Sequence, residues 1–208
     1  MKRNAVCKKC RREGKKLFLK GERCYTVKCA LVKRKYPPGV HGPKGHSRLS
    51  EYGHQLREKQ YLKRSYNISE TQLKNYFKKA KRHVGNTEIL FLQLLESRLD
   101  NVIFRSGLAV SRKQARQIVG HGNILVNNRR LDIPSYQVRV GDVLKPRERK
   151  SVIEEMKRQI SSRKVEETMP SWLNLDQKKL EVKVLKKPEA EDLPKDFNMG
   201  LVVEFYGK

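Results

Sequence analysis

The chain has 208 residues, of which 48 are lysine or arginine and 22 are aspartate or glutamate, giving a formal net charge of +26. Hydrophobic residues make up only 37% of it, which is low for an enzyme of this size and indicates small cores beneath a large charged surface. The charge disfavours an isolated compact monomer through self-repulsion and indicates a polyanionic partner. We expect no transmembrane helix and no secretory signal, because there is neither a long apolar run nor an apolar segment after Met1.

The positive charge is distributed unevenly along the chain. Residues 1–50 contain 16 basic and two acidic residues, whereas residues 151–208 contain 11 of each. Acidic residues are also absent from Val102 to Leu131. We therefore expect the polyanion to contact the N-terminal and central regions, and the neutral C-terminal quarter to contact protein.

All four cysteines lie near the start of the chain, in two short pairs. Cys7 and Cys10 have two residues between them, and Cys24 and Cys29 have four. This spacing is typical of a four-thiolate metal knuckle, in which the intervening loop folds back to complete a tetrahedron. Zinc is the default metal for such a site, and an iron–sulfur cluster is the alternative that spacing leaves open.

The other interpretation of the cysteines is four separate buried thiols. In a chain without a secretory signal we expect a reducing cytosol, and therefore metal ligands rather than disulfides. Basic residues surround the cysteines, Arg11 and Arg12 among them. They would offset the charge of the thiolates, and a knuckle this basic favours nucleic-acid binding.

The next segments predict a loop and then helices. Residues 36–43 contain two adjacent prolines and two glycines, which disfavour regular structure. Residues 47–66 are typical of a charged helix with few apolar positions. Ser69 and Gln72 form a capping box before an amphipathic helix that Gly85 ends.

The centre of the chain changes from helical to strand periodicity. Leucines recur at helical spacing in residues 88–105, and Ser111 can cap a further helix over residues 112–119. Residues 124–126 and 137–140 then predict strands, each followed by a turn.

The C-terminal region predicts one helix and two strands. Ser151 and Glu154 form a second capping box, which opens a helix. Residues 180–185 and 201–206 predict strands, with a loop rich in proline and acidic residues at 188–196 between them.

These elements predict an α+β fold in four segments. Residues 1–46 are the metal knuckle and its Pro/Gly loop, and residues 47–97 are a helical subdomain. Residues 98–165 are an RNA-binding module of helices packed on a small, mainly antiparallel sheet. Residues 166–208 are C-terminal strands and a loop that pack on the preceding domains.

The stretch from Arg98 to Tyr136 resembles the small RNA-binding module named after small-subunit ribosomal protein four. Arg112, Lys113 and Arg116 lie on one side of the predicted helix, opposite its apolar residues. A set of further residues completes a positive face for phosphates, sugars and bases: Arg129, Arg130, His121 and Tyr136. The alternative is an ordinary solvated helix face, but the absence of acidic residues nearby favours RNA contact.

Motifs along nearly the whole chain are similar to the bacterial family of small-subunit ribosomal protein four. They are R-R-E-G at 11–14, L-F-L-K-G-E-R-C at 17–24, Y-P-P-G-V-H-G at 36–42, L-R-E-K-Q at 56–60, L-L-E-S-R-L-D-N-V at 94–102, P-S-W-L at 170–173 and V-E-F-Y at 203–206. Each motif alone is weak, and their order makes the resemblance specific.

The resemblance implies a structural, non-enzymatic constituent of the small ribosomal subunit, located on ribosomes in the cytoplasm. It implies early binding of small-subunit ribosomal RNA that nucleates assembly of the body. It also implies a place at the channel through which messenger RNA enters, contact with small-subunit protein five and other small-subunit proteins, and a contribution to decoding accuracy. Some relatives repress translation of their own messenger.

We expect RNA contacts from Arg11, Arg12, Lys44, Arg48, Arg57, Lys59, Arg98, Arg112, Lys113, Arg116, His121, Arg129, Arg130 and Tyr136. We expect protein contacts from Glu189, Glu191, Asp192, Glu204 and Tyr206.

Two other functions compete with this prediction. One is an RNA-modifying enzyme that carries the same module, and the other is a free ribosome-rescue or heat-shock RNA binder. The enzyme is disfavoured because the chain has no Ser/His/Asp arrangement and no Gly-rich phosphate loop. Little sequence outside the module and the knuckle is left for a catalytic domain.

Overall fold

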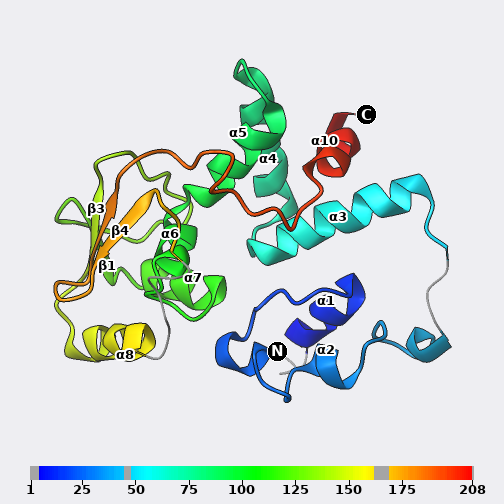
Figure 1. Cartoon of the computed structure of the whole chain (residues 1–208), viewed down its shortest axis with the longest axis horizontal. Coiled ribbons are helices and arrows are strands. Elements are labelled where there is room, and N and C mark those ends of the chain that lie inside the picture. The colour runs from blue at the N-terminus through cyan, green and yellow to red at the C-terminus, as the bar shows by residue number, and fades with distance from the viewer. Residues whose placement is uncertain (1–4, 45–47, 162–168, 208) are drawn as a thin grey trace. The chain divides into compact units, whose positions relative to one another are not determined.

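The structure is a computed structural model that describes residues 5–44, 48–161 and 169–207. The chain divides into two compact units, shown in Figure 1. Unit 1 contains residues 1–88 together with 194–208, and unit 2 contains residues 89–193. The chain therefore leaves unit 1, forms unit 2, and returns to complete unit 1. None of the described helices is both long and apolar enough to cross a membrane.

Helices are the regular elements in the described residues of unit 1. Its elements are α1 (Ala5–Glu13), the short 3-10 helix η1 (Gly21–Cys24), α2 (Ala30–Lys33), the 3-10 helix η2 (Gly42–Lys44), α3 (Glu51–Ser65), α4 (Glu70–Arg82) and α10 (Met199–Gly207).

Side-chain caps fix where the two long helices of unit 1 begin. The Ser50 hydroxyl accepts a hydrogen bond from the Gly53 amide at 3.2 Å and starts α3. The predicted capping box of α4 is confirmed, because Ser69 Oγ accepts from the Gln72 amide at 3.2 Å and Gln72 Oε1 accepts from the Ser69 amide at 3.3 Å. Each cap satisfies backbone donors that the first turn of a helix leaves unpaired.

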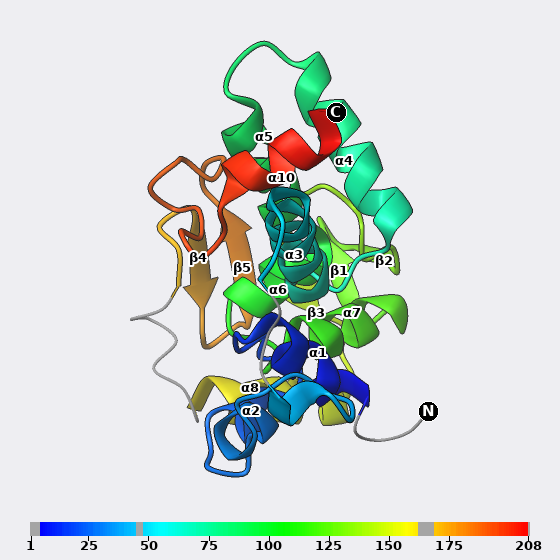
Figure 2. The same cartoon turned by 90° about the vertical axis from the view of Figure 1, so that its right-hand side faces the viewer.

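The predicted C-terminal strand is wrong, because residues 201–206 lie in helix α10. Figures 1 and 2 show this helix beside α3, and the two helices are in contact. Val202 is fully buried, and Asn198 Oδ1 accepts from the Leu201 amide at 3.3 Å at the start of the helix. Strand propensity is a weak preference here, and packing of the apolar face against α3 overrides it.

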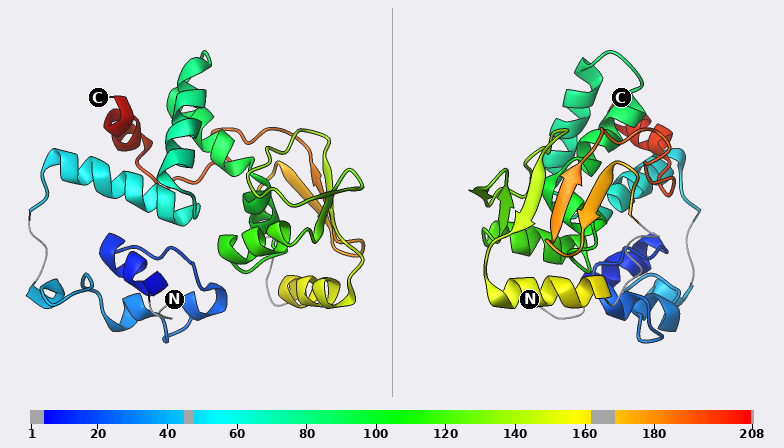
Figure 3. Two further views of the ribbon diagram at one scale, coloured as in Figure 1. Left: turned by 180° about the vertical axis from the view of Figure 1, so that it is seen from behind. Right: turned by 60° about the vertical axis from the view of Figure 1, so that its left-hand side comes forward.

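Unit 2 packs helices against one five-stranded sheet, as Figure 3 shows. Its elements are α5 (Thr87–Glu96, which begins at the end of unit 1), α6 (Leu99–Arg105), α7 (Arg112–Gly120), β1 (Ile124–Val126), β2 (Arg129–Leu131), β3 (Val143–Pro146), α8 (Lys150–Ser161), β4 (Leu173–Asp176) and β5 (Glu181–Val184). The strand order is β2-β1-β3-β5-β4, and every pair is antiparallel. The predicted α+β class with an antiparallel sheet is therefore confirmed.

The core of unit 2 lies between the sheet and its helices. Val102 and Ile103 of α6 and Ala115 and Val119 of α7 are fully buried in it. Trp172 is also fully buried in this core. Burial of these apolar side chains is the main driving force for the fold of the unit.

The first hairpin of the sheet has a two-residue turn at Asn127 and Asn128. Both have positive φ angles, 49° and 67°, which suit the type I′ turn that matches the twist of paired strands. The side-chain Nδ2 of Asn127 donates to Asp142 Oδ1 at 2.8 Å, and Asn127 Oδ1 accepts from the backbone amide of Val143 at 3.0 Å. These bonds hold the turn to the start of β3. The turn places Arg129 on the edge strand β2.

Two further predictions for unit 2 are wrong. Residues 137–140 form no strand beyond an isolated bridge at Gln137, because Asp142 Oδ2 accepts from the Arg139 amide at 2.8 Å and turns the chain before β3. Helix α8 begins at Lys150, so Ser151 lies inside its first turn and does not cap it. The predicted strand at 180–185 is confirmed as β5, whereas β2, β3 and β4 were not predicted.

The two serines that the sequence predicts in capping boxes, Ser69 and Ser151, make a direct test of the structure. We expect Ser69→Ala to lower the free energy of opening of α4 by about 1 kcal/mol, because it removes a side-chain cap. Hydrogen exchange of the α4 backbone amides measures this change. Ser151→Ala is the matched control, and α8 should change by less than about 0.5 kcal/mol. Equal losses in both helices would contradict the capping difference.

Candidate nucleic-acid interface

Helix α7 presents a row of basic residues because its other face is buried. The Ser111 hydroxyl accepts from the Gln114 amide at 3.3 Å and confirms the predicted cap. Ala115 and Val119 are fully buried against the core, one helical turn apart. Arg112, Lys113 and Arg116 therefore lie on the sides of the helix that point away from the core.

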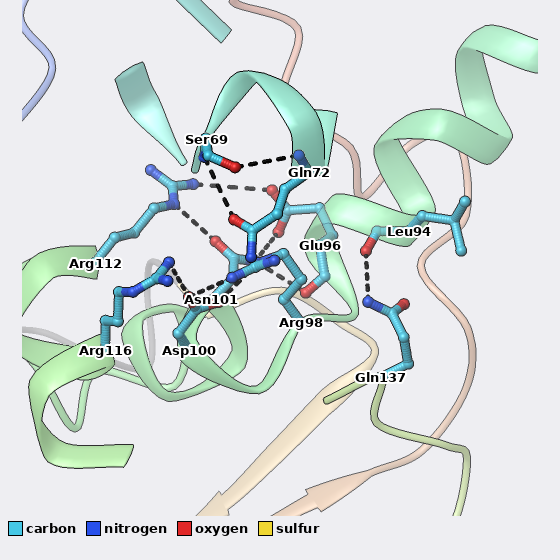
Figure 4. Close-up of polar contacts among 10 residues, drawn as sticks. All are labelled: Ser69, Gln72, Leu94, Glu96, Arg98, Asp100, Asn101, Arg112, Arg116 and Gln137. Atoms are coloured by element: carbon cyan, nitrogen blue, oxygen red, sulfur yellow. Dashed lines mark hydrogen bonds and ion pairs between the residues drawn. The ribbon is translucent and has the colours of Figure 1, made fainter. Parts of the chain in front are cut away.

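Arg112 is held by three groups (Figure 4). Its Nε donates to Asn101 Oδ1 at 2.7 Å, and its Nη2 lies 3.9 Å from Glu96 Oε1. Its guanidinium carbon lies 4.7 Å from the centre of the Phe104 ring, a cation–π contact. The side chain is 15% exposed, so it is fixed on one side and open to solvent on the other.

Beneath α7 lies a buried carboxylate, Glu96, whose side chain is 1% exposed. Arg105 donates to it through Nε and Nη2, both at 2.9 Å, and Asn101 Nδ2 donates at 2.8 Å. Such bidentate pairing is the arrangement that makes burial of a carboxylate tolerable.

A second buried carboxylate, Asp100, lies in the same network (Figure 4). Arg98 donates to both of its oxygens, at 3.0 and 2.7 Å, and Arg116 Nη1 lies 3.6 Å from Oδ2. Arg98, which we expected to contact RNA, is fully buried and its guanidinium faces Asp100. Arg116 is 35% exposed and keeps part of its side chain in solvent.

The edge of the sheet adds cations to those of α7. Arg129 and Arg130 are exposed on β2, and Lys113 and His121 are exposed at the two ends of α7. Gly122 has a φ of 65°, and a Cβ there would lie 2.2 Å from Arg130 Nε, so the Arg130 side chain rests against the backbone after α7. The structure thus brings the predicted residues of α7 and β2 into one region, whereas Tyr136 is half-buried against the core.

In unit 1, the predicted RNA-binding residues have mixed positions. Arg11 donates to the carbonyls of Tyr36 and Pro37, both at 2.9 Å, and thereby holds the Pro/Gly loop to α1. Arg48 is exposed. Arg12, Lys44 and Arg57 line one open cavity of about 560 Å³ together with the loop.

Arg57 and Lys59 also take part in the internal contacts of unit 1. Arg57 Nη1 lies 3.5 Å from the buried Glu13. Lys59 is buried, with its Nζ 2.8 Å from Glu70 Oε1 and 4.4 Å from the centre of the Phe205 ring. These contacts join α3 to its neighbouring helices.

The predicted zinc or iron–sulfur site is wrong. In residues 5–44, 48–161 and 169–207, no group of three or more His, Cys, Asp or Glu side chains is arranged to hold a metal ion. The four cysteines are free thiols that line a small cavity with apolar residues such as Leu19 and Leu31. Burial raises the pKa of the Cys10 thiol, which disfavours the thiolate that a metal needs. The thiols therefore pack as small apolar side chains.

The acidic residues that we expected to contact protein also bond within the chain. Glu189 pairs with Lys186 at 2.9 Å, and Asp192 accepts from the Ser171 hydroxyl at 2.6 Å. Glu191 is exposed in the same loop.

In unit 1, Glu204 accepts from Gln55 Nε2 at 3.1 Å, and the Tyr206 hydroxyl donates to Glu70 at 2.8 Å. Both bonds hold α10 within the unit. The expected role of these residues in contacts with other proteins stays a prediction.

Sequence reasoning missed three members of the network: Glu96, Asn101 and Arg105. The available signal was the placement of charged and amide residues inside an apolar helical run, since such groups are buried only when they are paired.

Comparison with known proteins gives consistent matches along the chain. Residues 2–96 match the family described as "Ribosomal protein S4/S9 N-terminal domain", and residues 97–144 match the family described as "S4 domain". A protein of Thermus thermophilus named "Small ribosomal subunit protein uS4" is 51% identical over 203 residues, which cover 98% of this chain and 97% of that protein.

Proteins of the same name from two other bacteria are also similar. The one from Nitrosospira multiformis is 49% identical over 202 residues, covering 97% of this chain and 96% of that protein. The one from Syntrophomonas wolfei is 47% identical over 208 residues, covering 99% and 98%.

The Glu70 carboxylate predicts an acid-dependent loss of stability in unit 1. Burial raises its pKa, but hydrogen bonds from Lys59, Lys63 and Tyr206 outweigh burial and lower the pKa from 4.5 to about 2. A carboxyl group with a lowered pKa in the folded state stabilises that state above its ordinary pKa and loses this contribution as the pH falls to its folded pKa. We therefore expect the stability of unit 1 to fall between about pH 5 and pH 2.

Urea unfolding across this pH range measures the effect. Glu70→Gln should remove the part of the pH dependence of the unfolding free energy that comes from this carboxyl group. Tyr206→Phe should give a pH dependence between those of Glu70→Gln and the wild type, because it removes one donor. Parallel curves for the wild type and Glu70→Gln would contradict the assignment.

Proposed function

The chain belongs to the family of small-subunit ribosomal protein S4, and on that premise we propose how its basic surfaces hold RNA. As a member of this family it is a structural, non-enzymatic protein of the small ribosomal subunit that binds ribosomal RNA. It works in the cytoplasm as part of the ribosome. The observation that best supports a specific RNA-binding surface is the cationic region that α7 and β2 form in unit 2.

We propose that this region, defined by Lys113, Arg116, Arg129 and Arg130, contacts the phosphates of ribosomal RNA. These residues come from a helix and an edge strand of one rigid core, so their spacing is set by the fold. No acidic residue lies between Val102 and Leu131 to compete with phosphate for them. The buried carboxylates Glu96 and Asp100 precede this stretch. Phosphate contacts of this kind fix the position of a protein on RNA, and exposed groups such as His121 can add sugar or base contacts.

A second proposed RNA-binding surface is the cavity in unit 1. Arg12, Lys44 and Arg57 line it, and Arg11 holds its loop in place through two carbonyl contacts. Cations from α1, the loop and α3 would then bind RNA at the same time. Binding that orders two separate surfaces on one RNA suits a protein that joins the ribosomal RNA early and nucleates assembly of the body, which is the role we propose.

We also propose a role where messenger RNA enters the subunit. Lys44 and Arg48 are exposed cations after the Pro/Gly loop. Such residues can hold the phosphates of an incoming single strand and oppose its re-pairing.

For decoding accuracy we propose that the acidic residues of the C-terminal region meet a basic neighbour, for which small-subunit protein five is the candidate. Glu191 and Glu204 are exposed and carry negative charge on an otherwise basic protein. Charged residues at the edge of an interface each contribute little to the binding free energy, but together they favour the correct partner and orientation.

The RNA-binding surface of unit 2 is tested with Lys113→Ala combined with Arg116→Ala. We expect weaker binding to small-subunit ribosomal RNA and a salt slope smaller by roughly one to two, because two phosphate contacts are lost. Filter binding at several salt concentrations measures both quantities.

The matched control is Lys178→Ala combined with Lys179→Ala. These exposed lysines lie between β4 and β5, at the opposite end of the strand order from β2. The control removes the same charge, and we expect a smaller change in slope. Identical slopes for the wild type and the Lys113/Arg116 variant would show that this part of α7 faces solvent.

The role at the incoming messenger is tested with Lys44→Ala combined with Arg48→Ala. We expect slower translation through a stable messenger hairpin, because the cations no longer oppose re-pairing, while subunits still assemble because Arg12 and Arg57 remain in the unit 1 cavity. Reconstituted translation of hairpin and unstructured messengers measures the rates. If both messengers are slowed equally, the two cations do not act on unpaired strands.

A further inference from the structure

We propose that Glu96 is a positioning residue for RNA recognition, which acts through Asn101 on Arg112 and directly on Arg105. This inference rests on the proposed RNA-binding surface of unit 2 and extends that surface to Arg105 and Arg112, whose geometry Glu96 fixes. Glu96 itself is buried and does not reach RNA.

The first step of the argument is the orientation of the Asn101 side chain. A carboxylate only accepts hydrogen bonds, so Glu96 favours the NH₂ group of Asn101, which donates to the carboxylate at 2.8 Å and to the backbone carbonyl of Glu96 at 2.9 Å. The amide oxygen must then point the other way, where it accepts from Arg112 Nε at 2.7 Å. Asn101 is fully buried, so its amide has no solvent to compensate for a reversed orientation.

The second step is the state of the arginines that face the carboxylate. Arg105 makes two hydrogen bonds of 2.9 Å to Glu96, which fix the plane of its guanidinium. Arg112 is fixed by Asn101 and by the ring of Phe104. Both side chains remain partly exposed, at 24% and 15%, so each is held from the inside and accessible from the outside.

The third step is the charge of the network. Four arginines pair with the two carboxylates, Arg98 and Arg116 with Asp100, and Arg105 and Arg112 with Glu96. A pairing that served only to neutralise buried acids would not need this excess of arginine. A rigid group of arginines loses less conformational entropy when it binds phosphate, and its planar donors match phosphate oxygens.

Charge and positioning predict opposite results when the carboxylate is neutralised. If Glu96 acts only through its charge, Glu96→Gln removes a negative group near the RNA and binding becomes tighter. If Glu96 positions the arginines, the same change weakens binding, because a glutamine has one side-chain acceptor oxygen in place of the two that hold Arg105 and Asn101.

The experiment measures binding of the full chain to purified small-subunit ribosomal RNA at several salt concentrations. We expect Glu96→Gln to raise Kd about tenfold with an unchanged salt slope, because order is lost in two arginines while the phosphate contacts remain. Glu154→Gln is the matched control, since Glu154 is exposed on α8 and the chemical change is the same. It should bind at least as tightly as the wild type.

A second variant keeps the inference testable if Glu96→Gln does not fold. Arg112→Lys keeps the charge but loses the Nε hydrogen bond to Asn101, and we expect it to weaken binding about tenfold. Arg158→Lys makes the same change at an exposed position of α8 outside the proposed surface and should stay within about twofold of the wild type. The Nε–H signal of Arg112 in an NMR spectrum, which reports its hydrogen bond directly, should shift in Glu96→Gln.

The outcomes separate this inference from the proposed function. If Glu96→Gln binds as tightly as Glu154→Gln, or if Arg112→Lys matches the wild type, positioning by Glu96 is refuted. If the Lys113/Arg116 variant nevertheless loses binding, the proposed surface stands and only positioning by Glu96 is refuted. No effect in the Lys113/Arg116 variant would instead refute the surface itself.

Discussion

The pairing of buried carboxylates with arginine and lysine is the constraint on which both units depend. The chain has few acidic residues, and several of them lie inside rather than on the surface. In unit 2, Glu96 and Asp100 are buried beneath arginines that they hold in place. In unit 1, the buried Glu13 contacts Arg57 and Arg64, and the half-exposed Glu70 contacts Lys59. Each acid allows cations to lie close together that would otherwise repel one another.

This placement of acids explains how a chain with so high a charge forms compact units. An exposed ion pair stabilises a protein little, but a buried carboxylate that is left unpaired is strongly destabilising. Burial raises the pKa of Glu13, whereas hydrogen bonds from three donors lower that of Glu70. The same kind of residue therefore experiences opposite shifts, according to whether desolvation or direct donors prevail.

Sequence patterns predicted those parts of the fold that depend on neighbouring residues. The caps at Ser69 and Ser111, the apolar face of α7, and strand β1 with the turn after it all follow from short-range rules. Helix α10 could not be predicted from its own residues, because its β-branched and aromatic side chains favour a strand and only packing on α3 makes it helical.

The candidate site was predicted in part, and for a similar reason. The spacing of Arg112, Lys113 and Arg116 indicates one helix face, and the structure brings them near the cations of β2. Spacing could not show that Arg98 is buried, since burial depends on the distant segments that enclose it. The cysteine spacing suggested a metal site, but their apolar surroundings decide how the thiols pack and are not visible in the spacing.

The return of the chain to unit 1 has a consequence for the order of events during synthesis. Helix α10 covers α3 and α4, yet the ribosome makes it only after all of unit 2. Unit 2 is continuous in sequence and can fold as soon as it emerges, whereas α3 must wait with an uncovered apolar face until residues 194–208 arrive. The centre of the chain can therefore engage RNA while the N-terminal unit is still incomplete, and closure of that unit becomes the last step of maturation.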